Sequence, residues 1–516
     1  MLRSVNYNNQ LSKFYFKKAK VAFPYKYKRP SKTLNLPSEI ATEYFDSIYG
    51  SYFGKQWPSI RLALFSIPKY SLLYNNYSHN QTTILNLKEE SDGSLKSIWD
   101  ILDLPNEFSV KLTNQSDKDI EELDIQDDNK NQVKKFNTIQ HKKIKLDDHS
   151  VDTYGFNSLD EEKLSRLVDF SHIPAQELVD LEKERYDYNA EIDNNRSLLS
   201  TDIEELEIFP EKSIYIPKNI QFYFYDKNEN IQNNIYKPFP PSPMTNKGLI
   251  VMYNFLEYYI MDASSIIPVL ALEIRPKNDI LDMCAAPGGK ALAAIQTLNF
   301  ETITCIEKST SRYNRLCKVF ETYLPKGQKF RSRIKTINAD AMHEKSFRNS
   351  FDRVLVDVPC TSDRKSVKSD DDNIFHKNRF KERALLPQIQ TDLLVEGIRN
   401  LKPGGKLVYS TCTLSPSQND AIIRSAYYSL SRLEPDIKIR VIDCSTLCQL
   451  LQTNFSFYKP NSASPQNCLV DHLNPDNDNS NINSSKENKK NLGHLIIPSL
   501  DMNWGPLYFC KIERIK

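Results

Sequence analysis

Residues 280–290 read Ile-Leu-Asp-Met-Cys-Ala-Ala-Pro-Gly-Gly-Lys, and this stretch decides the fold. The short apolar run 280–283 predicts a buried strand. The small residues and paired glycines that follow predict a tight loop that opens into a helix near Ala291. Backbone amides at such a helix N-terminus can approach a ligand closely. The stretch therefore predicts the first strand, loop and helix of a nucleotide-type α/β domain.

Strand-like runs recur after this stretch, at 302–306, 334–338, 353–358 and 406–410. Helical stretches separate them, the last over 381–401 with apolar residues at mostly three- and four-residue steps. Strands that alternate with helices predict a mostly parallel sheet covered on both faces. The carboxyl ends of such strands lie at one edge of the sheet, where these folds place their chemistry.

Acidic residues end three successive predicted strands. Glu307 closes the second strand, 18 residues after Gly289, near the place where Rossmann-type sites put an acid on a ribose. Asp340 ends the third strand and Asp357 the fourth. Together they suit a ligand with an adenine amine, a ribose and a positive sulfonium, which predicts S-adenosylmethionine as the cofactor. The Gly-x-Gly-x-x-Gly pattern is missing, which argues against NAD. In the alternative interpretation, Asp340 only caps a helix and Glu307 only faces solvent.

Two cysteines follow the fourth and the last of these strands: Cys360 in Asp357-Val-Pro-Cys360-Thr and Cys412 in Ser410-Thr-Cys412-Thr. Both can project from the same edge of the sheet, which predicts a pair of thiols acting on one substrate. A free cysteine is usually a small buried hydrophobe, but the polar neighbours of Cys412 favour a working thiol. Packing or incidental exposure is expected for Cys284, Cys305, Cys317, Cys444, Cys448, Cys468 and Cys510.

Composition limits the classes to which the chain can belong. Its 516 residues are too many for one ordinary core and allow two or three domains. With 68 basic and 66 acidic residues the net charge is +2, so any nucleic-acid surface must be local. The nine cysteines form no Cys-x-x-Cys pair and have no histidine cluster beside them, which predicts a reducing compartment and no metal site. No run of about 18 apolar residues predicts a membrane span.

The chain divides into four segments. Residues 1–38 contain Lys and Arg but no Asp or Glu, as expected of an organelle transit peptide; a basic arm that touches RNA is the alternative. Residues 39–109 predict a small helical unit, and 110–217 predict a polar, disordered insertion. Residues 218–516 hold the α/β domain, with a second polar insertion near 461–491.

Several motifs together resemble the Sun-domain RNA cytosine-5 methyltransferases: the run 284–290, the motif Asp357-Val-Pro-Cys360-Thr-Ser-Asp363-Arg364, and the run 410–415. The similarity extends to 56–61, 259–263 and 503–511 and covers roughly 43–105 and 218–516 apart from the second insertion. Within the family the chain looks most like the mitochondrial member that methylates small-subunit ribosomal RNA. The resemblance implies a class I S-adenosylmethionine-dependent methyltransferase, with a Rossmann-like α/β sheet, in the mitochondrial matrix.

The resemblance also implies roles for single residues. It makes Cys412 the nucleophile, Cys360 the residue that assists product release, and Asp357 a contact of both base and cofactor. Relatives often carry Asp where this chain has Glu307, and Gly where it has Ala341. The cofactor contacts that it implies are Cys284, Ala285, Ala286, Pro287, Gly288, Gly289, Lys290, Glu307, Arg312, Asp340, Ala341 and Asp357.

Cytosine-5 methylation explains the need for two thiols. Carbon 5 is a poor nucleophile, so an enzyme first adds a nucleophile to carbon 6, and a thiolate is soft and readily expelled. We expect Cys412 to attack while Asp357 holds the ring nitrogen and the amine. After methyl transfer, Cys360 assists removal of the carbon-5 proton. DNA cytosine-5 methyltransferases use the cysteine of their Pro-Cys motif as nucleophile and have no Thr-Cys partner, so Cys412 favours RNA.

The target base must be unstacked to reach Cys412. Basic residues could hold phosphates nearby, unless they only form the solvated face of a helix: Arg364, Lys365, Lys368, Lys377, Arg379, Lys381 and Arg383. The resemblance implies targeting by a protein of the mitochondrial transcription termination factor family or by the assembling ribosomal subunit. Two alternatives stay open, a mitochondrial transfer RNA as substrate and a ribosome-assembly scaffold whose methylation is dispensable.

Overall fold

The computed structural model describes nine ranges of residues between 36 and 516. The predicted transit peptide, apart from 36–38, and most of both predicted polar insertions lie outside the described residues. The described ranges are 36–78, 82–91, 94–102, 109–111, 206–211, 213–225, 239–243, 255–459 and 491–516.

Five parallel strands form one half of the main sheet and confirm the five predicted from the sequence. Their spatial order is β10 (Ile334–Ile337), β9 (Phe300–Ile306), β8 (Asn278–Asp282), β11 (Phe351–Asp357) and β12 (Leu401–Thr411). Because these strands are parallel, the loops that carry the predicted site residues leave one edge of the sheet.

The sheet continues beyond β12 with β15 (Leu507–Arg514), β13 (Ile439–Asp443) and β4 (Ile208–Pro210), and β14 (His494–Ile496) pairs with β15. Strand β15 runs antiparallel to both β12 and β13. The order β10-β9-β8-β11-β12-β15-β13, with β15 reversed, is that of a class I methyltransferase sheet. The predicted fold class is therefore confirmed.

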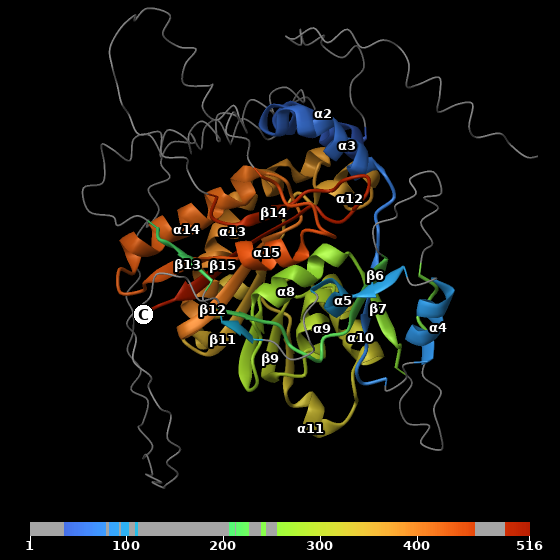
Figure 1. The fold of residues 1–516 in the computed structure, drawn as a ribbon. Coiled ribbons are helices and arrows are strands. Elements are labelled where there is room, and N and C mark those ends of the chain that lie inside the picture. Colours follow the sequence, from blue (N-terminus) through green and yellow to red (C-terminus); the bar gives the residue numbers. More distant parts are fainter. Residues whose placement is uncertain are drawn as a thin grey trace, which may run out of the picture. The chain divides into compact units, whose positions relative to one another are not determined.

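Both faces of the central strands are covered. Val354, Leu355 and Val356 of β11 are buried in succession, and successive side chains point to opposite faces. Helix α13 (Phe380–Asn400) packs on β11 and β12 and against α14 (Asp420–Leu433) (Figure 1). Gly397 allows α13 to approach closely, because an added Cβ would lie 2.8 Å from Val356 Cγ2.

The loop after β8 enters α9 (Gly289–Gln296) slightly before the predicted start at Ala291. Gly288 caps this helix with φ of 118°, in the left-handed region that L side chains rarely adopt. An added Cβ there would also lie 3.1 Å from Leu316 Cδ1 of α10 (Thr310–Tyr323). The glycine is therefore required by both backbone conformation and space.

The predicted helical unit 39–109 begins with α2 (Pro37–Phe53), the 3-10 turn η1 (Gly54–Gln56) and α3 (Trp57–Phe65). It continues with β1 (Ser71–Tyr74), α4 (Thr82–Glu90), β2 (Leu95–Ser97) and α5 (Ile98–Leu102). The two strands join β6 (Phe222–Tyr225) and β7 (Tyr258–Met261) in the sheet β2-β6-β1-β7. The prediction of helix is wrong for β1 and β2, because so short a run, all buried in β1, shows no periodicity.

The predicted boundary of the first insertion at residue 217 is also wrong. Strand β4 pairs with β13, and β5 (Ser213–Tyr215) pairs with β3 (Ser109–Lys111). Between them Glu211 is buried, and its Oε1 lies 2.7 Å from Nζ of the fully buried Lys511. A segment that buries a carboxylate against a distant lysine has the composition of a polar loop, so composition alone could not place it in the fold.

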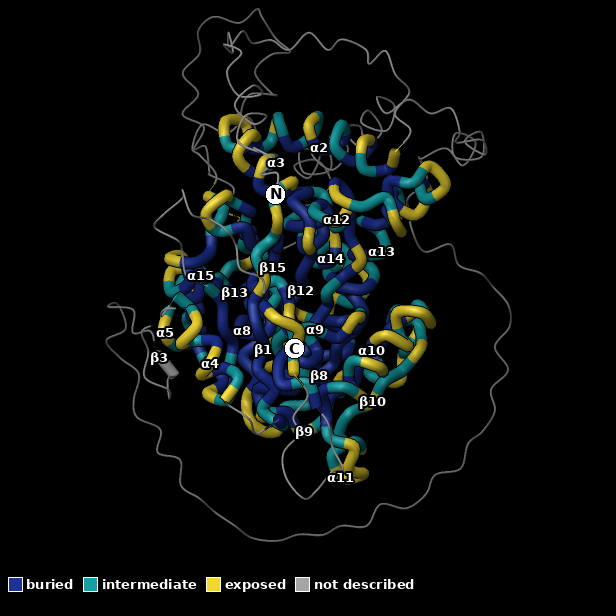
Figure 2. Tube along the Cα trace, turned by 90° about the vertical axis from the view of Figure 1, so that its right-hand side faces the viewer, coloured by how far each residue is buried: buried dark blue, intermediate teal, exposed yellow. Residues whose placement is uncertain are grey.

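Further helical elements complete the described part, and Figure 2 shows its buried residues along the strands and its exposed residues on outer helices such as α4 and α11. Within the described residues, no helix is long and apolar enough to cross a membrane. The further helical elements are η4 (Ala263–Ile266), α8 (Ile267–Ala271), α11 (Gln328–Arg331), η5 (Ala341–His343), η6 (Lys345–Phe347), α12 (Asp363–Lys368), η7 (Lys377–Arg379), η8 (Pro416–Gln418) and α15 (Ser445–Leu451).

Candidate active site

The two predicted cysteines lie next to each other. Strands β11 and β12 are in register with Asp357 opposite Ser410, so the loops carrying Cys360 and Cys412 leave the sheet side by side. The two Sγ atoms are 3.3 Å apart. Cys412 is exposed and Cys360 is buried. The structure therefore presents one thiol to solvent and supports it with a second.

The surroundings of the two thiols favour a thiolate on Cys412. The hydrogen bond with Cys360 lowers the pKa of Cys412. Partial desolvation of the thiol opposes this shift, and a hydrogen bond with Ser362 (Sγ to Oγ 3.4 Å) and the charge of Lys290 assist it. The same pairing with Cys412, together with burial, raises the pKa of Cys360 well above its ordinary value. Since the thiolate is the nucleophilic form, the geometry favours Cys412 as the attacking group.

A charged pair lies beside the thiols. Lys290 Nζ, at the start of α9, is 2.9 Å from Asp357 Oδ2 at the end of β11. Ser410 Oγ donates to Asp357 Oδ1 over 2.7 Å. Burial lowers the pKa of Lys290, but the charge and hydrogen bond of Asp357, with the nearby Cys412 and Asp282, raise it overall, so the lysine is held as a cation. These contacts fix the orientation of Asp357 at the same edge as Cys412.

Glu307 is buried rather than solvent-facing, which excludes the alternative given for it above. Its Oε1 accepts from Ser309 N at 2.9 Å and its Oε2 from Ala286 N at 3.4 Å. Arg312 Nη1 lies 3.7 Å from Glu307 Oε2, and Arg312 Nη2 donates to Ala286 O at 2.5 Å. Glu307 and Arg312 therefore hold the loop after β8 from the side of β9.

Asp340 does cap a helix, as the alternative interpretation had it. Its Oδ1 accepts from Met342 N at 3.1 Å, at the start of η5, and its Oδ2 lies 2.8 Å from Lys308 Nζ. Burial raises the pKa of Asp340, but the hydrogen bonds of Lys308 and Met342 and the charges of Lys308 and His343 lower it overall, so it is ionised at neutral pH. Ala341 is buried beside it. Capping does not preclude a ligand contact, because the carboxylate remains partly exposed.

The residues present fit S-adenosylmethionine. Carboxylates at or just after the ends of β10 and β9, and of β11 on the other side of β8, suit a ligand that carries a ribose, an amine and a positive sulfonium. Gly289 leaves the helix start close to Tyr259, whose Cε1 would lie 3.3 Å from an added Cβ. The rest of the loop is small: Cys284 is partly exposed, and Ala285, Ala286 and Ala291 are buried. Pro287, Gly288 and Lys290 complete the cradle at the N-terminus of α9.

Two buried carboxylates were missed by sequence reasoning. Asp282 ends β8, and burial and the neighbouring Asp357 raise its pKa to about 7. Asp363 is fully buried and contacts both cysteine-bearing loops. Both residues stand inside the quoted motifs, but their burial depends on elements far away in the sequence.

The basic residues that were predicted to bind phosphates fall into a buried group and a more exposed group. Arg364 is held by three bonds, from Nε to Gly505 O (2.6 Å), from Nη1 to Ala63 O (3.1 Å) and from Nη2 to Asn503 Oδ1 (2.7 Å). Arg383 is buried with its guanidinium over the ring of Phe375. The prediction of a phosphate contact is wrong for these two arginines. Three further members of the set contact protein groups: Lys365 and Arg379 pair with Asp372, and Lys368 donates to Ser66 O. Lys377 is exposed. Lys381 is exposed on α13.

Most of the remaining cysteines pack as expected. Cys305, Cys444, Cys448 and Cys510 are buried, and Cys317 is partly exposed. Cys468 lies outside the described residues.

A class I sheet, a loop that fits S-adenosylmethionine and a thiol pair at the adjoining strand ends define the class of an S-adenosylmethionine-dependent methyltransferase. The family described as 16S rRNA methyltransferase RsmB/F matches residues 269–447. The 5-cytosine rRNA methyltransferase NSUN4 of Xenopus laevis is 32% identical over 480 residues, which cover 93% of this chain and 91% of the relative. The chain thus belongs to the RsmB/F (NSUN) family of S-adenosylmethionine-dependent RNA cytosine-5 methyltransferases.

Two further relatives differ in how much of the chain they match. The 5-cytosine rRNA methyltransferase nsun-4 of Caenorhabditis elegans is 30% identical over 494 residues, which cover 94% of both chains. The mitochondrial tRNA (cytosine(34)-C(5))-methyltransferase of Mus musculus is 32% identical over 259 residues, which cover 50% of this chain and 64% of the relative. The similarity to the Xenopus laevis and Caenorhabditis elegans relatives, both named for ribosomal RNA, therefore extends beyond the α/β domain.

Proposed function

We propose that this chain methylates carbon 5 of a cytosine in mitochondrial small-subunit ribosomal RNA and thereby supports assembly of the mitochondrial ribosome in the matrix. The long similarity to relatives named as 5-cytosine rRNA methyltransferases supports the ribosomal substrate. The acid-free, basic start of the chain supports the mitochondrial location. Residues 1–38 would then be the transit peptide, and 218–516 together with the N-terminal elements would form the catalytic unit.

The observation that carries the catalytic assignment is the 3.3 Å separation of the Cys360 and Cys412 thiols. Cys412, the exposed thiol with the lowered pKa, attacks carbon 6 of the cytosine. Asp357, oriented by Lys290 and Ser410, holds the ring nitrogen and the exocyclic amine. Cys360 then assists removal of the carbon-5 proton, so that the bond to Cys412 breaks and the product leaves.

The cofactor supplies an electrophilic methyl group when it is bound. Glu307 suits the ribose hydroxyls, and Asp340 and Ala341 suit the adenine. The loop 284–290, braced by Arg312, forms the floor at the N-terminus of α9. Lys290, the last residue of this loop, pairs with Asp357, and the charges of both act on Cys412, so the pair connects the cofactor side of the site to the thiol side.

The experiment that tests substrate and nucleophile together is bisulfite sequencing of mitochondrial RNA. Cells that lack the protein are complemented with wild type, Cys412→Ala or Cys317→Ala, the last being a matched control at a partly exposed cysteine of α10 outside the site. We expect one small-subunit ribosomal methylcytosine to be lost with Cys412→Ala and kept with Cys317→Ala. Loss of a methylcytosine in a transfer RNA would instead favour the substrate named for the Mus musculus relative, which matches 50% of this chain.

A second experiment separates the roles of the two thiols. If Cys360 assists release, Cys360→Ala should accumulate a covalent protein–RNA adduct that survives denaturing electrophoresis, and Cys360→Ala combined with Cys412→Ala should form none. An adduct that persists in the double variant would contradict the assignment of Cys412.

Ribosome assembly without methylation is the alternative function. Rescue of assembly by Cys412→Ala would favour a scaffold role, with targeting by a protein of the mitochondrial transcription termination factor family or by the ribosomal subunit itself. The intact thiol pair and its oriented Asp357 support catalysis instead.

A further inference from the structure

Asp363 is a fully buried carboxylate that contacts both cysteine-bearing loops. Its Oδ1 accepts from Thr361 Oγ1 at 2.7 Å, one residue beyond Cys360. Its Oδ2 accepts from Leu414 N at 2.8 Å, two residues beyond Cys412. The backbone N–H of Asp363 also donates to Cys412 O over 3.3 Å. One side chain and its own amide therefore join the two loops directly behind the thiols.

The third donor to Asp363 comes from the N-terminal helix. Tyr49 OH of α2 donates to Asp363 Oδ2 over 2.9 Å, and it lies 3.2 Å from Thr413 Oγ1. Thr361 Oγ1 bonds Thr413 Oγ1 over 2.8 Å. The Tyr49 hydroxyl, although more than 300 residues away in sequence, thus contacts Asp363 in one loop and Thr413 in the other.

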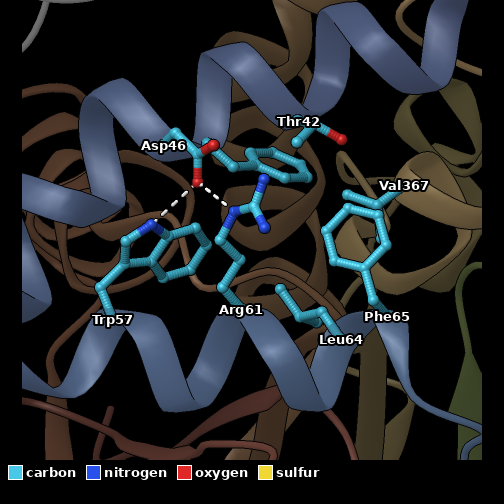
Figure 3. Close-up of a pocket in the computed structure, with 8 residues that line it drawn as sticks. Thr42, Asp46, Trp57, Arg61, Leu64, Phe65 and Val367 are labelled. Atoms are coloured by element: carbon cyan, nitrogen blue, oxygen red, sulfur yellow. Dashed lines mark hydrogen bonds and ion pairs between the residues drawn. The ribbon is translucent and has the colours of Figure 1, made fainter. Parts of the chain in front are cut away.

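Helix α2 is held firmly where Tyr49 reaches the loops. Asp46 Oδ1 of α2 accepts from Trp57 Nε1 at 3.0 Å and from Arg61 Nε at 2.6 Å, both from α3, and Figure 3 shows these bonds in the small pocket between the helices. The Tyr49 ring stacks on Phe45 and meets Trp57 edge-on, with ring centroids 5.0 and 5.4 Å apart. The phenol therefore has a fixed position before it meets Asp363.

The pKa shifts of Asp363 and Tyr49 agree with the hydrogen bond between them. Burial raises the pKa of the Asp363 carboxyl, and its hydrogen bonds to Leu414, Thr361 and Tyr49 oppose the shift. Burial and the nearby carboxylate raise the pKa of Tyr49 well above its ordinary value, so the phenol keeps its proton and acts as a donor. A buried carboxylate needs all of its donors, since an unmade bond there costs its full desolvation.

We propose that Asp363 and Tyr49 are positioning residues for catalysis: they hold the Cys360 and Cys412 loops at the separation that methylation requires, and they make helix α2 part of the active site. The inference rests on the roles proposed above for the two thiols. Neither residue can touch the substrate in this structure, because Asp363 and Tyr49 are both fully buried. A substitution that shifts α2 relative to α3 would therefore displace the Cys412 loop through Tyr49.

The test removes one oxygen. Tyr49→Phe keeps the ring and its packing but deletes the donor to Asp363. We expect kcat for methyl transfer to fall about tenfold, because small displacements of reacting groups are costly. The Kd for S-adenosylmethionine should stay within about twofold, since the residues of the cofactor loop keep their contacts. Asp363→Asn, which puts an amide N–H against existing donors, should show a larger loss in the same direction.

The readout specific to positioning is the reactivity of Cys412 itself. The rate of alkylation of the Cys412 peptide by iodoacetamide, followed by mass spectrometry across pH, reports its thiolate without RNA or cofactor. We expect its midpoint to move to higher pH in Tyr49→Phe, because the hydrogen bond from Cys360 that lowers the pKa of Cys412 depends on the loop separation.

A matched control separates positioning from general stability. Tyr508→Phe deletes another buried hydroxyl donor to an aspartate, Asp420, whose other two donors are the backbone N–H groups of Leu492 and Gly493. The proposal requires that Tyr49→Phe lowers kcat and shifts the alkylation midpoint more than Tyr508→Phe at equal loss of thermal stability. Equal effects of the two variants, or an unchanged alkylation profile in Tyr49→Phe, would overturn it. Failure of the proposed function looks different, because Cys412→Ala would then retain methyl transfer.

Discussion

Replacing Asp282 with asparagine should flatten the pH dependence of the protein's stability near neutrality. Asp282 ends β8 and is fully enclosed, and its Oδ1 accepts one backbone N–H, that of Cys284, at 3.3 Å. Burial and the charge of Asp357 raise its pKa from 3.8 to about 7. Asparagine keeps the shape and the acceptor oxygen but cannot ionise, so it isolates the effect of the charge.

The sign follows from proton linkage. Between about pH 4 and pH 7 the folded chain keeps a proton on Asp282 that the unfolded chain releases, so this group's stabilisation is complete below about pH 4 and is lost as pH rises through about 7. Each pH unit in that window is worth about 1.4 kcal/mol, and rounding at both ends leaves about 2 kcal/mol between pH 5 and pH 7.

Urea unfolding of wild type and Asp282→Asn at pH 5, 6, 7 and 8 measures this difference. Other groups titrate equally in both proteins, so only the difference between the two curves is used. We expect the variant to gain about 2 kcal/mol on wild type between pH 5 and pH 7, and little more by pH 8. Parallel curves over the whole range would refute the reasoning, since they would mean that Asp282 ionises in the fold as readily as in the unfolded chain.

Three further outcomes are expected. Lys290→Met should lower kcat about 100-fold with little loss of thermal stability, because Asp357 loses the cation that orients it; single-turnover methylation and thermal melting check this. Gly397→Ala should destabilise the fold by about 1–3 kcal/mol in urea, because its Cβ would overlap Val356. Arg364→Met should cost about 3 kcal/mol in unfolding free energy while leaving the salt dependence of RNA binding unchanged; a shallower salt slope at wild-type stability would restore the phosphate contact.

The sequence predicted the half of the fold that rests on local patterns. All five parallel strands lie within a few residues of the predicted runs, because each is a buried apolar segment bounded by turns. Strands β1 and β2 were predicted as helix, and β4 as part of an insertion. These strands are stabilised by partners distant in sequence, β6, β7 and β13, so nothing in their own residues distinguishes them.

The candidate site divides in the same way. Cys360, Cys412 and Asp357 stand at strand ends in order, so a parallel topology alone brings them to one edge. The side chains that orient them were not predictable, because the contact of Lys290 with Asp357 depends on the pairing of β8 with β11, which are far apart in sequence. For Asp340, the two roles that the sequence offered as alternatives are compatible, since the same residue serves as helix cap and candidate ligand contact.

The motif that runs from Asp357 to Arg364 shows why sequence cannot separate chemistry from scaffold. Its first acid faces the site, paired with Lys290, while Asp363 and Arg364 at its end face α2 and α3. All three are charged and polar in the sequence, and charge in a loop suggests contact with substrate. Only the packing of α2 and α3 against α12 turns the last two inward. The N-terminal helices therefore decide which charges of the catalytic motif remain available to RNA and which hold the thiols in place.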